Sequence, residues 1–342
     1  MRTVEWHNGV VRMIDQRQIP WELVQVDLPT YQEVAESITN MTIRGAPAIG
    51  AAAAFGMALA AKQSQADTKH ALVNDLQRAA KILKNTRPTA VNLAWAVDRM
   101  LKFLDSATTP DEIRDTLLAE AQRIADEDVA INRKMGANGA ELIEDGFTIL
   151  HHCNTGSLAT VNFGTALGVV RAAHEQGKEI HVLLGETRPR LQGARLSAWE
   201  MEQAGIDYDI LPDTAAGFYM QKQEIDIVVV GADRVASNGD FANKIGTYQI
   251  AVLAKENNIP FYTVTPTSTI DLSLPGGSHI PIEHRDKMEV LAPSGKQLVP
   301  EHFNARNPAF DVTPHRYLTG IITENGIARA PFTDSLKKMV NG

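Results

Sequence analysis

The sequence predicts an α/β protein, with a Rossmann-like, doubly wound parallel sheet domain preceded by a smaller, mainly helical N-terminal domain. Three observations support this prediction. From about residue 146, short apolar runs rich in β-branched residues alternate with helical segments, as in a parallel sheet covered on both faces. Before that point, helical patterns predominate. The length of 342 residues is also long for one domain and suits two.

The N-terminal domain is expected to span residues 1–125 and to begin with two brief strands, Val10–Ile14 and Leu23–Asp27. The helices that follow are alanine-rich or carry apolar residues at helical spacing. They are predicted at Pro47–Gln63, Thr68–Lys84, Pro88–Leu104 and Asp111–Ala130. We expect the last of them to join the two domains.

The second domain is expected to span residues 126–342. Its predicted strands are the short apolar runs, each followed by a polar or glycine-containing loop. They are Phe147–His151, Ile180–Leu184, Tyr208–Leu211, Ile225–Val230 and Phe261–Val264. The first strand is not followed by the G-x-G-x-x-G pattern, so a dinucleotide cofactor is not indicated.

Charge and composition restrict the partners. A net charge of −8 argues against nucleic acid, which usually needs a basic face, and an anionic substrate requires a local basic cluster. The longest run of small apolar residues, Ala46–Ala61, is too short to span a bilayer, and the N-terminus does not resemble a signal peptide. The single cysteine fits a reducing compartment. We therefore expect a cytoplasmic protein without a membrane partner.

Ligands of open α/β sheets bind at the carboxyl ends of the strands, so reactive residues that follow strands are candidates for a site. Cys153 follows the first predicted strand, where a thiol can act as an acid or a nucleophile. As a free cysteine, it can equally be a small buried hydrophobe. Asp233 follows the fourth strand and can transfer protons, or simply pair with Arg234.

The N-terminal half supplies possible anion ligands. Arg44 precedes the helix predicted at Pro47, and Arg87 precedes Pro88, which suits the first position of the next helix. Helix N-termini present free N–H groups and a positive dipole end to anions, so two arginines so placed favour a phosphate. Either arginine alone is better explained by a surface carboxylate partner.

Lys244, in the pair Asn243-Lys244, is predicted to open a helix. It can bind a phosphate or a sugar hydroxyl, form a Schiff base, or point into solvent. The histidines do not have metal-ligand spacing, and the sequence contains neither HExxH nor CxxC. We expect no metal site.

Several segments resemble motifs of the methylthioribose-1-phosphate isomerases, and they occur in that family's order. The segments are Thr42–Gly50 (TIRGAPAIG), Arg87–Leu93 (RPTAVNL), Cys153–Gly156 (CNTG), Glu186–Arg195 (ETRPRLQGAR), Gly231–Arg234 (GADR), Asn243–Tyr248 (NKIGTY) and Asn307–Pro314 (NPAFDVTP). Together they extend over most of the chain, and their combination is specific.

The resemblance implies an aldose–ketose isomerase that converts 5-methylthio-α-D-ribose 1-phosphate to 5-methylthio-D-ribulose 1-phosphate in methionine salvage, without a cofactor. It implies Cys153 and Asp233 as the catalytic pair. It also implies a set of substrate contacts, namely Arg44, Gly45, Ala46, Arg87, Gln192, Asn243 and Lys244. A homodimer is expected, with the substrate in a cleft between the two domains.

The superfamily that contains these isomerases also contains proteins with other functions, which remain alternatives for this chain. It includes ribose-1,5-bisphosphate isomerases, which need a second basic cluster, and regulatory subunits of the initiation-factor exchange complex, which do not need the Cys–Asp pair. A 5-deoxyribose 1-phosphate substrate is not separable from the methylthio sugar by sequence. Transfer of hydrogen as a proton through an enediol, or as a hydride from C2 to C1, also stays open.

Overall fold

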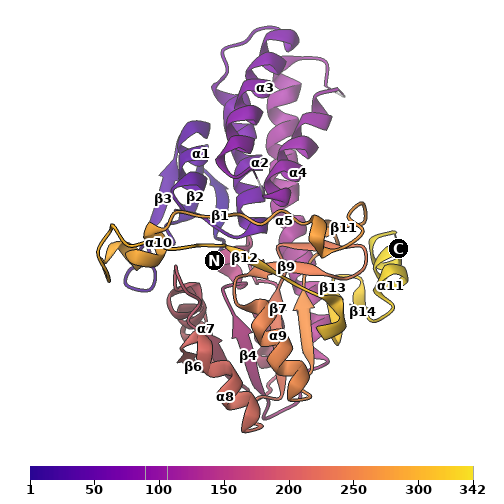
Figure 1. Cartoon of the computed structure of the whole chain (residues 1–342). Coiled ribbons are helices and arrows are strands. Elements are labelled where there is room, and N and C mark those ends of the chain that lie inside the picture. The colour runs from indigo at the N-terminus through magenta and orange to yellow at the C-terminus, as the bar shows by residue number, and fades with distance from the viewer. Residues whose placement is uncertain (89, 106, 342) are drawn as a thin grey trace. The chain divides into compact units, whose positions relative to one another are not determined.

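The computed structural model of the chain (Figure 1) describes residues 1–88, 90–105 and 107–341, which form two compact units. Unit 1 comprises Met1–Ala130 together with Ser157–Asn162. Unit 2 comprises Ile131–Gly156 and the chain from Phe163 onward. The short segment Ser157–Asn162 therefore leaves unit 2 and packs within unit 1.

Unit 1 begins with an antiparallel sheet of β1 (Val4–His7), β2 (Val10–Ile14) and β3 (Gln25–Leu28). The strand predicted at Val10–Ile14 is confirmed, whereas β3 lies slightly later than its predicted range. Helix α1 (Tyr31–Thr39) follows. Its first turn is closed by a capping box, in which the Thr30 hydroxyl accepts the Glu33 N–H and the Glu33 carboxylate accepts the Thr30 N–H.

Helix α2 (Ala46–Gln63) lies at the centre of unit 1, and its residues from Ala48 to Ala61 are all buried. Alanine and glycine make this possible, because small side chains let neighbouring helices approach from every side. A Cβ at Gly50 would lie 3.1 Å from the Asn92 carbonyl oxygen, which places the first turns of α2 and α4 side by side. The other helices of the unit are α3 (Lys69–Thr86), α4 (Val91–Lys102) and the start of α5 (Pro110–Ala140).

The predicted start of the helix Pro88–Leu104 is wrong. Arg87 is the C-cap of α3, with φ −145° and ψ 80°, and the Ala90 N–H donates to the Arg87 carbonyl. Helix α4 begins only at Val91. Arg87 thus ends one helix and lies one turn before the next.

Unit 2 is built on a seven-stranded sheet whose order is β14-β13-β10-β7-β4-β5-β6. Its six parallel strands, taken in chain order, are arranged 3-2-1-4-5-6, as in Rossmann folds, and antiparallel β14 forms one edge. The strands are β4 (Thr148–His152), β5 (His181–Gly185), β6 (Asp207–Leu211), β7 (Ile227–Gly231), β10 (Phe261–Val264), β13 (Gly320–Thr323) and β14 (Gly326–Ala328). The predicted parallel sheet is confirmed.

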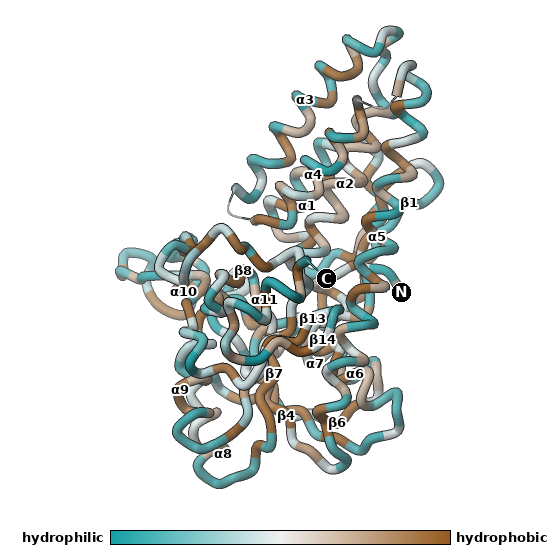
Figure 2. Tube along the Cα trace, turned by 90° about the vertical axis from the view of Figure 1, so that its right-hand side faces the viewer, coloured by the Kyte–Doolittle hydropathy of each residue, from teal (hydrophilic) through white to brown (hydrophobic). Residues whose placement is uncertain are grey.

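Alternate residues of the central strands enter two separate apolar cores. Ile149 and Ile227 pack in one core with residues of α6 and α7, while Leu150 and Val228 pack in the other with residues of α8, α9 and α11. Figure 2 shows the apolar course of β4 and β7 in brown. The covering helices are α6 (Ala166–Glu175), α7 (Ala198–Ala204), α8 (Ala216–Gln221), α9 (Thr247–Glu256) and α11 (Phe332–Asn341).

A second, four-stranded sheet of unit 2 was not predicted. Its order is β11-β8-β9-β12, and its strands are β8 (Arg234–Ala236), β9 (Phe241–Lys244), β11 (Ile270–Asp271) and β12 (Phe310–Thr313). Asn243 and Lys244 end strand β9, so the prediction that they open a helix is wrong. Within the described ranges, none of the helices is both long and apolar enough to cross a membrane.

Candidate active site

Cys153 and Asp233 follow two strands that lie next to each other in the sheet. Strands β4 and β7 pair with Leu150 opposite Val228, and continuing this register puts Cys153 opposite Gly231, the last residue of β7. Strand order reverses between β4 and β7, because β5 lies on one side and β10 on the other. The two candidates therefore flank the point of the sheet where ligands of such folds bind.

The loop that carries Cys153 passes close to the end of β7. A Cβ at Gly231 would lie 2.7 Å from Cγ2 of Thr155, so only glycine leaves the loop this space. His151 ties the two strands together, with Nδ1 2.8 Å from the Val229 carbonyl oxygen. Burial lowers the pKa of His151 to about 4, so this ring is neutral at physiological pH and acts as a structural group.

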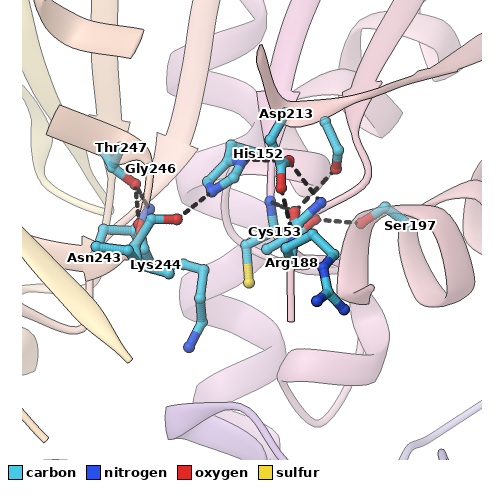
Figure 3. A network of polar contacts seen from close by, with 12 residues as sticks. His152, Cys153, Arg188, Ser197, Asp213, Asn243, Lys244, Gly246 and Thr247 are labelled. Carbon is cyan, nitrogen blue, oxygen red and sulfur yellow. Dashed lines mark hydrogen bonds and ion pairs between the residues drawn. The ribbon is translucent and has the colours of Figure 1, made fainter. Parts of the chain in front are cut away.

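Cys153 adopts a backbone conformation that an L-residue rarely takes, with φ 71°. Such a left-handed conformation costs about 1–2 kcal/mol and needs support from its surroundings. The Cys153 N–H donates to the Thr187 hydroxyl at 2.9 Å, and the Cys153 carbonyl accepts from the Ser197 hydroxyl at 2.7 Å (Figure 3). The residue is only 6% exposed.

Asp213, which follows β6, organises the loop after β5. Its carboxylate accepts the N–H groups of Thr187 and Arg188, both at 2.7 Å. His152 lies nearby, with Nδ1 3.8 Å from the Asp213 carboxylate, and its Nε2–H donates to the Ile245 carbonyl at 2.9 Å. Burial lowers the pKa of His152, against the effects of that carbonyl and of Asp213, so the ring is neutral.

Asn243 and Lys244 are the last two residues of strand β9, next to Ile245, whose carbonyl accepts the His152 hydrogen bond. The Lys244 ammonium donates to the Ala309 carbonyl at 2.9 Å and lies 4.4 Å from the centre of the Phe310 ring. In Figure 3, the Lys244 amino group and the Cys153 sulfur point toward the same side. Asn243 is buried, and its side-chain amide donates to the Thr247 hydroxyl at 3.0 Å.

Gln192 presents a buried oxygen that lacks a partner. Among the described residues, nothing donates a hydrogen bond to its Oε1 atom, although the side chain is only 7% exposed. It immediately precedes a π-helical turn, Gly193–Ser197. A Cβ at Gly193 would overlap the Gly185 carbonyl oxygen, so glycine is required for this turn to approach the end of β5. Such turns inside helices are frequent at functional sites.

The remaining predicted residues lie in unit 1. Gly45 is the N-cap of α2 with φ 97°, and a Cβ there would overlap the backbone of Ala159. The Arg87 guanidinium contacts the Met41 sulfur at 3.6 Å, beside the segment that leads to Arg44. The N-cap residues of α2 and α4, Gly45 and Ala90, make no side-chain capping hydrogen bond. The first-turn N–H groups of two adjacent helices thus lie beside the arginines.

The structure therefore divides the predicted site residues between the units. Cys153, Gln192, Asp233, Asn243 and Lys244 belong to unit 2, and the others, Arg44, Gly45, Ala46 and Arg87, belong to unit 1. The loop of Cys153 continues directly into Ser157–Asn162, which packs within unit 1 against Gly45. In the described part of the chain, no three His, Cys, Asp or Glu side chains are grouped so that they could hold a metal ion.

Sequence reasoning did not single out Thr187, Ser197 or Asp213. The only signal for Thr187 was its place in the stretch Glu186–Arg195, and the only signal for Asp213 is its position just after the predicted strand Tyr208–Leu211. Chemically, unit 2 brings a thiol, a carboxylate, an ammonium and a buried amide oxygen to the carboxyl ends of its strands. This set of groups suits proton transfer and the binding of hydroxyl groups.

Residues 42–330 match the profile of the initiation factor 2 subunit family. A methylthioribose-1-phosphate isomerase of Geotalea uraniireducens is 54% identical over 341 residues, covering 99% of each chain. The crystal structure of 5-methylthioribose 1-phosphate isomerase from Pyrococcus horikoshii is similar with a TM-score of 0.93 and 53% identity, covering 99% of this chain and 95% of that one. A structure described as translation initiation factor eIF-2B subunit delta from A. fulgidus has a TM-score of 0.90 and 42% identity, with full coverage of both chains.

Proposed function

This chain belongs to the initiation factor 2 subunit family and, within it, to the methylthioribose-1-phosphate isomerases, and we propose that Cys153 and Asp233 perform its reaction. The enzyme is an aldose–ketose isomerase that converts 5-methylthio-α-D-ribose 1-phosphate to 5-methylthio-D-ribulose 1-phosphate in methionine salvage. The observation that carries the proposal is the position of the two residues, which follow the adjacent parallel strands β4 and β7 where strand order reverses.

The reaction poses a specific chemical problem. An ordinary aldose opens to a free aldehyde, which acidifies the proton on C2. Here the anomeric oxygen carries phosphate, so ring opening must proceed with the phosphate attached. We assign Asp233 to acid–base work at the ring oxygen or the 2-hydroxyl, and Cys153 to proton donation or electrostatic assistance at the reacting carbons. Positioned acid–base groups contribute roughly 100-fold or more to such a rate.

Unit 1 supplies the phosphate-binding groups of this proposal. The N-termini of α2 and α4 lie side by side, Arg44 and Arg87 accompany them, and Gly45 and Ala46 provide backbone N–H groups. Oriented N–H groups and guanidinium ions are strong ligands for a phosphate. The two arginines and these N–H groups make up one anion-binding cluster in the proposal. One cluster fits a monophosphate substrate, because a bisphosphate needs a second.

Unit 2 supplies the proposed sugar contacts. The unpartnered Gln192 oxygen can accept a hydrogen bond from a hydroxyl, and Asn243 and Lys244 can donate to sugar oxygens. In this proposal the two units act as the helical N-terminal domain and the Rossmann-like catalytic domain, and the enzyme works in the cytoplasm as a homodimer. Sedimentation equilibrium tests the dimer.

The function is tested by incubating the purified protein with 5-methylthioribose 1-phosphate, without added metal or nucleotide, and following ketose formation. Ribose 1,5-bisphosphate and 5-deoxyribose 1-phosphate serve as competing substrates. Turnover that is clearly fastest with the methylthio sugar supports the proposal. Faster turnover of the bisphosphate would reassign the substrate. No turnover of any sugar by folded protein would favour a regulatory role, as the description of the A. fulgidus relative suggests.

The route of the hydrogen atom is tested with substrate deuterated at C2, in ordinary water. Full retention of deuterium at C1 of the product indicates hydride transfer from C2 to C1. Extensive exchange with solvent indicates a proton transfer through an enediol, with Cys153 or Asp233 carrying the proton.

A further inference from the structure

The conformation of Cys153 is held from both sides by two buried hydroxyl groups of one segment. The Thr187 hydroxyl accepts the Cys153 N–H at 2.9 Å, and the Ser197 hydroxyl donates to the Cys153 carbonyl at 2.7 Å. Both residues are fully buried. The two peptide groups that flank Cys153 are therefore fixed by side chains rather than by the regular hydrogen bonds of a strand or helix.

We infer that Thr187 and Ser197 are positioning residues for the isomerisation, because they hold Cys153 in the left-handed conformation that aims its thiol. This inference rests on the proposed function, in which Cys153 acts on the substrate. Without the two bonds, a residue at φ 71° relaxes toward the ordinary negative range of φ, and its side chain swings with the backbone.

Each hydroxyl is oriented by a second hydrogen bond. Thr187 donates its own proton to the Gly185 carbonyl at 2.9 Å, which leaves a lone pair for the Cys153 N–H. Ser197 donates to the Cys153 carbonyl and accepts the side-chain amide of Asn154 at 3.2 Å. Since neither hydroxyl is free to rotate without losing a bond, the pair is rigid.

The backbone that carries these hydroxyls is itself fixed. Asp213 accepts the Thr187 N–H, and Thr187 also lies in the left-handed region, with φ 64°. Ser197 ends the π-helical turn that Gly193 allows to approach the end of β5. Asp213, the loop after β5 and this turn therefore all help to fix the position of the Cys153 backbone.

Thr187→Val and Ser197→Ala remove the hydroxyls with little change in shape. We expect kcat for 5-methylthioribose 1-phosphate to fall about 10- to 100-fold in each, since displacing a reacting group by about 1 Å has effects of this size. KM should stay within about threefold, because the phosphate and sugar contacts are untouched. Thr187→Ser, which keeps the hydroxyl, should restore most of the kcat.

Thr319→Val is the matched control. The Thr319 hydroxyl also accepts a backbone N–H, that of Phe261 at 3.0 Å, but at the amino end of β10 and away from the proposed site. Its removal should lower the unfolding midpoint in urea and leave kcat unchanged. A loss of kcat in Thr187→Val that merely followed the loss of stability would appear in this control as well.

A second readout does not depend on turnover. Cys153 is the only cysteine of the chain, so alkylation by iodoacetamide reports on this thiol alone. We expect alkylation of folded Thr187→Val and Ser197→Ala to be roughly threefold faster or more, because the loop opens more often. Thr187→Ser and Thr319→Val should react like wild type.

The inference is overturned if folded Thr187→Val and Ser197→Ala keep both the wild-type kcat and the wild-type alkylation rate, or if Thr187→Ser fails to restore them. Failure of the proposed function looks different, because wild type itself would then not turn over the sugar phosphate. In that case the alkylation rates alone decide whether the hydroxyls hold Cys153.

Discussion

Gly231 and Thr155 lie so close together that a Cβ at position 231 would be 2.7 Å from Cγ2 of Thr155. Gly231 ends β7 two residues before Asp233, and Thr155 lies two residues after Cys153. This close contact therefore joins the two loops that carry the proposed catalytic pair.

Gly231→Ala should displace the Cys153 loop. We expect kcat to fall about 10- to 100-fold, and the free energy of unfolding to fall by about 1–3 kcal/mol from overpacking. Steady-state kinetics and urea unfolding measure the two effects. Gly177→Ala is the control, because a Cβ there meets no atom within 4 Å although φ is +86°. It should lose stability and keep kcat; equal kcat values in both variants would refute the role of the contact.

Gln192→Met tests the unpartnered amide oxygen. The substitution keeps the length of the side chain and removes a buried acceptor whose isolation is unfavourable by about 1–3 kcal/mol. We expect unchanged or higher stability together with a KM that rises about tenfold, since a substrate hydroxyl loses its acceptor. A lower stability with an unchanged KM would show that Gln192 serves the fold and not the substrate.

Arg87→Met tests the phosphate cluster. A charge-assisted hydrogen bond contributes about 1.5–3 kcal/mol, so KM should rise about 10- to 100-fold. Inhibition by inorganic phosphate should weaken by a similar factor. Arg78→Met is the matched control, because Arg78 lies on α3, which Arg87 caps, and is largely exposed in an ion pair with Asp75. If both variants bind phosphate alike, Arg87 is not a phosphate ligand.

Asp311 should make the free energy of unfolding fall as pH rises from 4 to 7. Burial raises its pKa to about 6, although the N–H groups of Gly246 and Tyr248 and the charge of Lys244 favour the ionised carboxylate. Its unfolded pKa is about 3.9. Between these values the folded state binds more protons than the unfolded state, so its contribution to stability is full below pH 4 and is lost as pH rises through 6.

Comparison with Asp311→Asn isolates this contribution. From pH 4 to pH 7, the stability of wild type relative to the variant should fall by about 1–3 kcal/mol, as measured by urea unfolding at each pH. The variant removes the titration and leaves the other ionisable groups in place. A difference that stays constant over this range would mean that Asp311 is ionised throughout.

Edge strand β6 was predicted although most of its residues are exposed, and the parallel strand β13 was not predicted. The other four parallel strands, β4, β5, β7 and β10, were predictable because each is a short, nearly continuous apolar run. Such a run is what a strand buried on both faces requires, and Phe261–Val264 was predicted with its observed bounds. The sheet of β8, β9, β11 and β12 was not predictable in this way. Its strands have two to four residues, and β9 pairs with β12 across more than sixty residues of chain, as in Phe310 opposite Lys244. The local pattern of apolar and polar residues does not indicate which distant segments pair with each other.

The helix that was predicted to begin at Pro88 begins later, at Val91, because a turn comes first. Proline suits a first helical position, but Arg87 there closes α3 and a turn precedes Val91. The local preference was compatible with a turn as well as with a helix, and the observed turn is closed by the hydrogen bond from the Ala90 N–H to the Arg87 carbonyl.

For the site, Cys153 and Asp233 could be named as candidates from the sequence because strand ends are where such folds place ligands. Thr187, Ser197 and Asp213 could not, since each acts on backbone atoms of a different segment. Whether a hydroxyl meets a distant N–H depends on the positive φ values at Cys153 and Thr187, which only the folded chain reveals.

The central claim is that Cys153 and Asp233 perform the isomerisation. Its most direct test is the kcat for 5-methylthioribose 1-phosphate of wild type, Cys153→Ala and Asp233→Asn, each shown to be folded by its urea unfolding curve. We predict turnover by wild type and a loss of about 100-fold or more in each variant. A folded variant that retains kcat within a few-fold of wild type would contradict the claim.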